Sequence, residues 1–301
     1  MSALVIAADD FGLAEDVNDA IEEAHRNGVL SAASLMVAGP AAAHAVALAK
    51  RLPTLRVGLH LALVEAAPAS RPQDIPDLVD SDGQLRRDMV RLAFAIALRG
   101  GVHGQLRREI AAQFRAFRRT GLTLDHVNAH KHFHVHPLIA RDVLSIGRDY
   151  GMNALRVPAE PAQIVARIDN KPPAFSERVM APWTTALRGW ARRAGLTTPD
   201  AVFGLRWTGA VTAERLAALM PLLPDGLVEI YTHPATRDDF AGHAPGYAYA
   251  GELKALTDPE VIAAVKRSGR RLGGYVDAGS AATAALNASD TPRAGTTRSR
   301  P

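Results

Sequence analysis

Short apolar runs alternate with segments of helical spacing along this chain of 301 residues, and the alternation leaves few architectures open. The first run, Leu4–Ala8, predicts a strand, and Ala14–Asn27 then repeats apolar residues at helical intervals until Gly28 stops the helix. Further strands are predicted at Ser34–Val37, Arg56–Leu61, His126–Ala129, Leu155–Val157, Ala201–Leu205, Val228–Tyr231 and Leu272–Tyr275. Further helices are predicted at Ala41–Lys50, Leu85–Leu98, Gln105–Thr120, Pro137–Tyr150, Ala213–Met220 and Asp258–Ser268. Seven or eight such βα units indicate a parallel sheet, either closed into a barrel or open and doubly wound.

Two segments depart from this pattern. Residues Pro158–Pro199 contain Trp183 and Trp190 and predict an excursion with one helix. Residues 278–301 hold no aromatic residue and are rich in Ala, Ser, Thr and Arg, a composition typical of disordered tails. We therefore expect a single domain over residues 1–277 and a disordered tail over 278–301.

Four of the predicted strands end in titratable side chains. Asp9 and Asp10 follow the first strand, His60 ends the third, and His130 and His233 follow two later ones. In a (β/α) barrel the C-terminal ends of the strands converge on one mouth, where active sites are built. This placement favours an irregular (β/α) barrel, TIM-like, with about seven parallel strands, over the open sheet.

The Asp9–Asp10 pair would place two carboxylates side by side at the end of a buried strand. Two such groups repel each other unless a cation or a pKa shift relieves them. One could bind a metal while the other acts as a general base; the alternative is an Asx turn or a helix N-cap. His60, among the apolar residues of Gly58–Leu61, is either a metal ligand or a core histidine with a hydrogen-bond partner.

The densest group of histidines lies in His126–Pro137, which holds five of the chain's eleven. From His130 to His136 they occupy every second position and would point to one side of an extended segment. Neutral imidazoles suit divalent metals. A catalytic site needs about three protein ligands and one open position, so the histidines cannot all be ligands. The alternative is a His-rich surface loop with no role.

Two more residues are candidates for catalysis. His233, between Thr232 and Pro234, could be a general acid for a leaving amine, or a plain loop histidine. Arg156 could orient a catalytic carboxylate through a bidentate pair, or be exposed on the surface.

Composition limits both the chemistry and the compartment. The chain has no cysteine, which excludes disulfides, thiolate metal sites and a cysteine nucleophile. No basic residue precedes the first apolar run, so the N-terminus does not resemble a secretory signal. We therefore expect a cytoplasmic protein.

Charge is unevenly distributed along the chain. The formal net charge is +4, yet residues 86–119 alone hold nine Arg against two acids. This segment could face an anionic membrane or a nucleic acid, or form two solvated helices. We expect no nucleic acid as a partner, and peripheral membrane contact of this segment would fit one apolar stripe of residues that it also carries. These residues are Leu92, Phe94, Ile96 and Leu98.

Five segments together resemble the YdjC-like carbohydrate deacetylases, a family that includes chitooligosaccharide deacetylases. They come in the family's order and are Ala8–Gly12, Gly58–Leu61, Asn128–His134, Arg156–Pro158 and Thr232–Pro234. The resemblance implies an irregular (β/α) barrel and a hydrolase that removes an N-acetyl group from a sugar. It also implies one divalent metal ion. Two His and a carboxylate suit Zn²⁺, Fe²⁺, Mn²⁺ or Co²⁺, and the family allows Mg²⁺.

Applied to this sequence, the family's pattern makes Asp10, His60 and His130 the metal ligands. Asp9 becomes the base that activates water. His233 becomes the acid that protonates the departing amine.

The same pattern assigns supporting roles. Arg156 would hold Asp9, and His132 and His134 would either lie behind the ligands or contact the substrate. Asn128 is a departure, because the family often has Asp at this position. The departure leaves open the charge of the side chain beside the metal ligands, but it does not change the ligand set itself.

The run Asn128–Pro137, the Arg-rich segment and the ending Leu272–Tyr275 are similar to the hopanoid-biosynthesis (HpnK) branch of the family. This similarity implies an N-acetylglucosaminyl bacteriohopanepolyol as the glycolipid substrate. The alternative substrate is a chitooligosaccharide. We also expect a homodimer, since barrel enzymes often self-associate.

Two other function classes stay open. Two His and a carboxylate could form the facial triad of a non-haem iron oxygenase, although such enzymes usually have double-stranded β-helices rather than alternating strands and helices. A non-catalytic metal-binding or sugar-binding protein would leave Asp9 and His233 without a role.

Overall fold

A computed structural model describes residues 2–170, 172 and 175–278. Its seven strands form one sheet in which every pairing is parallel, in the order β4-β3-β2-β1-β6-β5, with β7 beside the start of β1. The strands are β1 (Ala3–Phe11), β2 (Ala32–Leu35), β3 (Arg56–Leu61), β4 (Val127–Ala129), β5 (Ala201–Phe203), β6 (Leu227–Thr232) and β7 (Arg271–Leu272). The TIM-like fold with about seven parallel strands is confirmed. Of the tail predicted over 278–301, residues 279–301 lie outside the described part of the chain.

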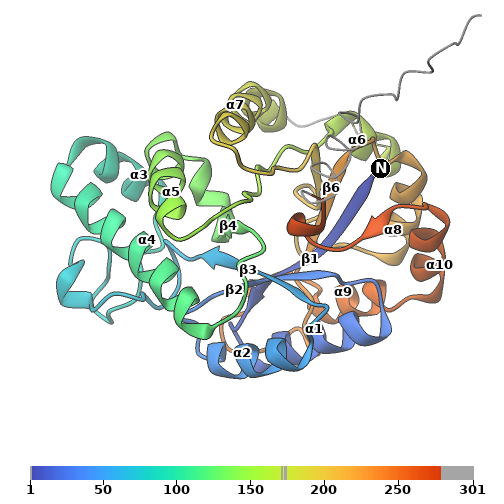
Figure 1. The fold of residues 1–301 in the computed structure, drawn as a ribbon, viewed down its shortest axis with the longest axis horizontal. Coiled ribbons are helices and arrows are strands. Elements are labelled where there is room, and N and C mark those ends of the chain that lie inside the picture. Colours follow the sequence, from blue (N-terminus) through green and yellow to red (C-terminus); the bar gives the residue numbers. More distant parts are fainter. Residues whose placement is uncertain (1, 171, 173–174, 279–301) are drawn as a thin grey trace, which may run out of the picture.

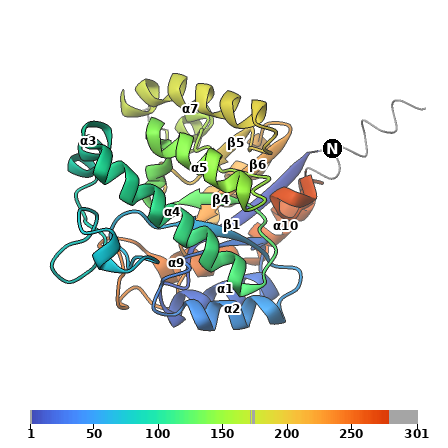
Figure 2. The ribbon, with the colours of Figure 1, turned by 60° about the vertical axis from the view of Figure 1, so that its left-hand side comes forward.

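Ten helices of the described chain surround the strands, as both ribbon views show (Figure 1, Figure 2). They are α1 (Glu15–Asn27), α2 (Ala42–Arg51), α3 (Met89–Leu98), α4 (Gly100–Thr120), α5 (Pro137–Asp149), α6 (Ala162–Asp169), α7 (Phe175–Arg193), α8 (Ala213–Leu219), α9 (Tyr249–Leu256) and α10 (Pro259–Arg267). Short 3-10 helices add η1 (Pro72–Asp74), η2 (His130–Val135) and η3 (Met220–Leu222). Within the described residues, no helix is both long and apolar enough to cross a bilayer.

The central strand β1 is buried along its whole length, as expected of a parallel strand covered on both faces. Its pairing with β2 is regular at Ala7 and Ala8 and becomes irregular before Phe11. Within this irregular stretch Asp10 has a left-handed backbone, with φ of 62°. In a regular strand, neighbouring side chains point to opposite faces. The irregular pairing turns the end of the strand, so that the side chains of Asp9 and Asp10 both point towards the same site.

The two edges of the sheet, β4 and β5, are joined by the segment 153–159. On one side the Arg156 N–H donates to the Val127 carbonyl at 2.9 Å. On the other side the Val202 N–H donates to the Ala159 carbonyl at 3.0 Å. These bonds close the sheet into an irregular barrel.

Three predictions about individual elements are wrong in detail. Leu155–Val157 makes an isolated bridge at Leu155 instead of a strand, because Pro158 has no N–H to continue a ladder. The excursion at Pro158–Pro199 holds two helices, α6 and α7, rather than one. The last strand ends at Leu272, and Tyr275 begins a helical turn.

Candidate active site

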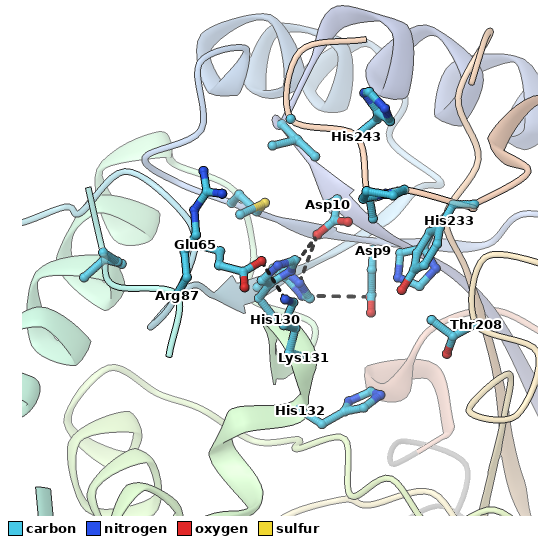
Figure 3. Close-up of a pocket in the computed structure, with 18 of the residues that line it drawn as sticks. Asp9, Asp10, Glu65, Arg87, His130, Lys131, His132, Thr208, His233 and His243 are labelled. Carbon is cyan, nitrogen blue, oxygen red and sulfur yellow. Dashed lines mark hydrogen bonds and ion pairs between the residues drawn. The ribbon is translucent and has the colours of Figure 1, made fainter. Parts of the chain in front are cut away.

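The titratable residues predicted at the strand ends meet at one mouth of the barrel. They line a cavity of about 540 Å³, together with polar residues from several loops. Figure 3 shows Asp9, Asp10 and His130 gathered at its centre, with Glu65 and Lys131 on one side and His233 on the other. Parallel strands bring these side chains together from positions more than 200 residues apart in sequence, from Asp9 to His233.

Three of these side chains form a cluster that could hold a metal ion. The ligand atoms of Asp10, His60 and His130 all lie within 4.8 Å of one another. Asp10 Oδ1 is 3.3 Å from His60 Nε2 and 3.1 Å from His130 Nδ1. One carboxylate and two imidazoles are a donor set that suits a divalent transition metal and leaves coordination positions open.

Asn128 determines which nitrogen of His60 is free to bind a metal. The Asn128 Nδ2 group donates to Asp9 Oδ1 at 3.0 Å and to Ser34 Oγ at 2.9 Å, so Asn128 Oδ1 faces His60. His60 Nδ1 donates to this oxygen at 2.7 Å, which leaves the lone pair on Nε2. Among the described residues Nε2 has no hydrogen-bond partner, although it is buried. A buried lone pair aimed at a carboxylate fits a metal ligand, and Asn128 fits the hydrogen-bonded support behind it.

The charges of the candidate ligands also fit a bound cation. Burial alone would raise the pKa of Asp10, but His130 and His60 hold this pKa well below its usual range. Burial would lower the pKa of His130, but Asp10 raises it. In the metal-free site Asp10 and His130 therefore stabilise each other's charged forms, and a metal ion would compete with a proton for His130.

The second carboxylate, Asp9, is held by a cation from the other side of the barrel. Asp9 Oδ2 accepts from Arg156 Nη1 at 2.5 Å. Burial would raise the pKa of Asp9, but Arg156 outweighs it and holds this pKa well below its usual range. Asp9 is therefore ionised at neutral pH, as a general base must be.

Arg156 is itself held by Glu229, a residue that was not predicted from the sequence to belong to the site. Arg156 Nε donates to both Glu229 oxygens at 3.0 Å, and Nη2 donates to Glu229 Oε1 at 2.7 Å. The hydroxyl of Tyr275 donates to Glu229 Oε2. The guanidinium also lies over the Tyr231 ring, 4.8 Å from its centre. A charged residue in the middle of the apolar strand Leu227–Thr232 was the signal that could have identified Glu229.

A second series of hydrogen-bonded polar side chains leads from Asn128 into the interior of the barrel. Ser34 Oγ lies 2.9 Å from His126 Nε2, and His126 Nδ1 lies 2.9 Å from Asp125 Oδ2. Gly58 makes room for this ring, because a Cβ there would lie 2.5 Å from His126 Nε2. His126, one of the histidines of the predicted His-rich run, therefore supports the position of Asn128 through Ser34.

The remaining histidines of that run point in different directions. The prediction that they point to one side of an extended segment is therefore wrong. The chain forms η2 instead, with left-handed Lys131 (φ 53°) and His132 (φ 54°). His132 lines the cavity, and its Nε2 lies 3.2 Å from the Tyr231 hydroxyl. His134 turns inward, and its Nε2 donates to the Arg156 carbonyl at 2.8 Å.

His233 lines the cavity between two aromatic rings. Its ring centre lies 5.5 Å from that of Tyr231 and 5.2 Å from that of Tyr247. Its backbone N–H donates to Glu252 Oε2 at 2.5 Å, which fixes the turn after β6. Burial lowers the pKa of the His233 side chain, although the negative charges of Asp10 and Asp9 act in the opposite direction and raise it.

Replacing Asn128 by Ala is expected to weaken metal affinity about 10–100-fold, because His60 loses the partner that fixes its tautomer and ring orientation. Asn128→Asp keeps an acceptor at this position and should retain the affinity. Competition with a chromophoric chelator measures both variants. Equal affinity in Asn128→Ala and the wild type would show that His60 does not bind through Nε2.

Replacing His134 by Gln is expected to make folding less sensitive to acid. Burial lowers the pKa of His134 from 6.5 to about 4, so its contribution to stability is complete above pH 6.5 and is lost as pH falls through 4. Gln can still donate to the Arg156 carbonyl but does not titrate. Between about pH 7 and about pH 4.5, the wild type should lose about 2 kcal/mol more of its unfolding free energy than the variant. Urea unfolding of the metal-free proteins measures this difference, and parallel pH curves would contradict it.

Several known proteins are similar to this chain over most of its length. The family of YdjC-like proteins matches residues 3–267. A carbohydrate deacetylase of Brevibacillus brevis is 34% identical over 86% of this chain and 92% of its own length. A carbohydrate deacetylase of Geobacillus stearothermophilus is 32% identical over 89% of this chain and 94% of its own length. A solved structure from Enterococcus faecalis, described as a cellobiose-phosphate cleavage protein, superimposes with a TM-score of 0.72 at 25% identity and covers 92% of this chain and 98% of its own. The chain therefore belongs to the YdjC-like protein family.

Proposed function

We propose that this chain is a carbohydrate deacetylase that uses one divalent metal ion to hydrolyse the N-acetyl group of an N-acetylglucosamine-type sugar. The observation that carries the proposal is the buried lone pair on His60 Nε2, 3.3 Å from Asp10 and beside an ionised Asp9. The names of the two relatives, both carbohydrate deacetylases, support it. The parallel (β/α) fold argues against a non-haem iron oxygenase, and the presence of Asp9 and His233 at the same cavity argues against a plain binding protein.

When bound at Asp10, His60 and His130, Zn²⁺ or Mg²⁺ supplies a Lewis acid that polarises the acetyl carbonyl and acidifies water. Asp9, kept ionised by Arg156, takes the proton of the water that attacks the carbonyl carbon. The C–N bond then breaks, and the nitrogen needs a proton because an amine anion is a poor leaving group. His233, which lines the same cavity, would donate it from its protonated form. The products are acetate and an amino sugar.

For the substrate, we infer an N-acetylglucosaminyl bacteriohopanepolyol, supported by the sequence similarity at Asn128–Pro137 and Leu272–Tyr275. A soluble chitooligosaccharide is the second candidate, favoured by the solved relative described as a cellobiose-phosphate cleavage protein. We further propose that residues 1–277 act as one catalytic domain of a cytoplasmic homodimer. Residues 86–119 would contact the inner face of the membrane, where the exposed side chains of Val90, Phe94 and Leu98 accompany arginines.

The test is acetate release by the metal-reconstituted protein from N-acetylglucosaminyl bacteriohopanetetrol and, in parallel, from diacetylchitobiose. Product mass identifies the deacetylated species, and Asp9→Asn serves as the inactive control. Acetate from the glycolipid alone is the expected result. Acetate from diacetylchitobiose alone would keep the mechanism and replace the substrate. No acetate from either, across several divalent metals, would contradict the proposed activity.

A further inference from the structure

An apolar groove lies beside the catalytic cavity and is not used by the mechanism. It has a volume of about 740 Å³ and runs between α3 and the chain that follows His130. Its walls are mostly aliphatic or aromatic, with polar side chains from Lys131, His132 and His136. The other lining residues are Met89, Val90, Ala93, Phe94, Ala97, Phe133, Val135, Pro137 and Trp183.

Side chains of α3 are left uncovered along this groove. Val90 is 68% exposed and Phe94 is 65% exposed, whereas Leu92 and Ile96 on the opposite face are buried. The apolar residues predicted to form one stripe therefore divide between two faces of α3. Exposed large side chains gathered in a concave site indicate a binding surface rather than a core.

Trp183, from α7, forms part of the opposite wall. Its indole N–H donates to the Val135 carbonyl at 2.7 Å, so the polar edge of the ring is satisfied within the protein. The ring is half-buried, and what it presents to the groove is apolar. A sugar here would leave most of its hydroxyl groups without partners, at a cost in free energy.

The groove adjoins the catalytic cavity, because Lys131 and His132 line both. Both residues have left-handed backbones at this junction, next to the metal ligand His130. A ligand that crosses the junction has its polar end among Asp9, Asp10 and His130 and its other end against α3.

From this adjacency and the apolar lining we propose that the groove binds an extended hydrocarbon aglycone joined to the N-acetyl sugar that is deacetylated. The inference rests on the proposed function for the placement of the sugar, and on the groove for the nature of the aglycone. It makes Val90, Phe94, Ala97 and Trp183 specificity-determining residues, because they would distinguish a glycolipid from a free sugar.

The test compares octyl and methyl N-acetyl-β-glucosaminide, with the octyl compound below its critical micelle concentration. Each methylene that leaves water contributes about fourfold to affinity, so kcat/KM for acetate release should favour octyl about tenfold or more. Ala97→Glu places a charge in the groove and should bring the octyl-to-methyl ratio close to one. Leu98→Glu is the matched control, since Leu98 is 80% exposed on the same helix but does not line the groove; it should keep the wild-type ratio.

Isothermal titration of the same two glycosides separates the groove from the activity. If no acetate is released, the proposed function fails. Tighter binding of the octyl compound, lost in Ala97→Glu and kept in Leu98→Glu, would still support the groove. Equal binding of both glycosides by the wild type would overturn the inference. Equal losses in the two variants would overturn it as well, because they would show that the octyl chain is not bound in the groove.

Discussion

Replacing Asp9 by Asn is expected to slow acetate release about 10²–10⁴-fold. The amide has nearly the shape of the carboxylate and can still accept from Arg156 Nη1, but it cannot take a proton from water. Asp9 is not one of the three clustered ligands, and its Oδ1 lies 3.9 Å from His60 Nδ1, the nitrogen that bonds Asn128. The variant should therefore bind metal as the wild type does. Steady-state acetate release, together with metal analysis of the purified variant, measures both properties.

The control for this variant is Asp239→Asn, which makes the same chemical change at an exposed carboxylate outside the cavity lining. It should retain wild-type activity. If Asp9→Asn kept full activity with metal bound, Asp9 would not be the base. If the variant lost its metal as well, Asp9 would support activity by stabilising metal binding rather than by acting as the base.

Replacing Arg156 by Met is expected to lower the free energy of unfolding by about 3–5 kcal/mol. Arg156 is fully buried and pairs with Asp9 on one side and Glu229 on the other. Met fills much of the same volume but leaves two buried carboxylates with no cation. Urea unfolding of the metal-free proteins at neutral pH measures the loss. The deficit should shrink in acid, because protonation neutralises the unpaired carboxylates.

The matched control is Arg71→Met, which removes an exposed ion pair with Asp74. An exposed pair is screened by solvent and should contribute no measurable stability. Equal unfolding curves for Arg156→Met and the wild type would mean that the two carboxylates find other partners. The account of how Asp9 is held would then be wrong.

The meeting of Asp9, Asp10, His60 and His130 could be anticipated from sequence because the carboxyl ends of parallel strands share one mouth. The strand ends converge on this mouth even where a predicted strand limit differs by a few residues from the observed one, as in β2 and β5. His233 was found in the same way, since it directly follows β6.

The supporting residues could not be predicted because they depend on packing between distant segments. Glu229 and Tyr275 meet across 46 positions, and their pairing follows from the barrel's closure rather than from any local pattern. The His-rich run failed as an extended segment because Lys131 and His132 adopt left-handed backbones, which residues other than Gly rarely do. Helix α9 was missed because Gly251 interrupts its helical pattern.

The central claim is that a divalent ion held by Asp10, His60 and His130 is required for hydrolysis of an N-acetyl sugar. Its most direct test is a titration of the chelator-treated protein with Zn²⁺ or Mn²⁺, following acetate release from an N-acetylglucosaminide. We expect no activity without metal, a rise that ends at one ion per chain, and no recovery in His60→Ala. Full activity in the metal-free protein, or full recovery of His60→Ala, would contradict it.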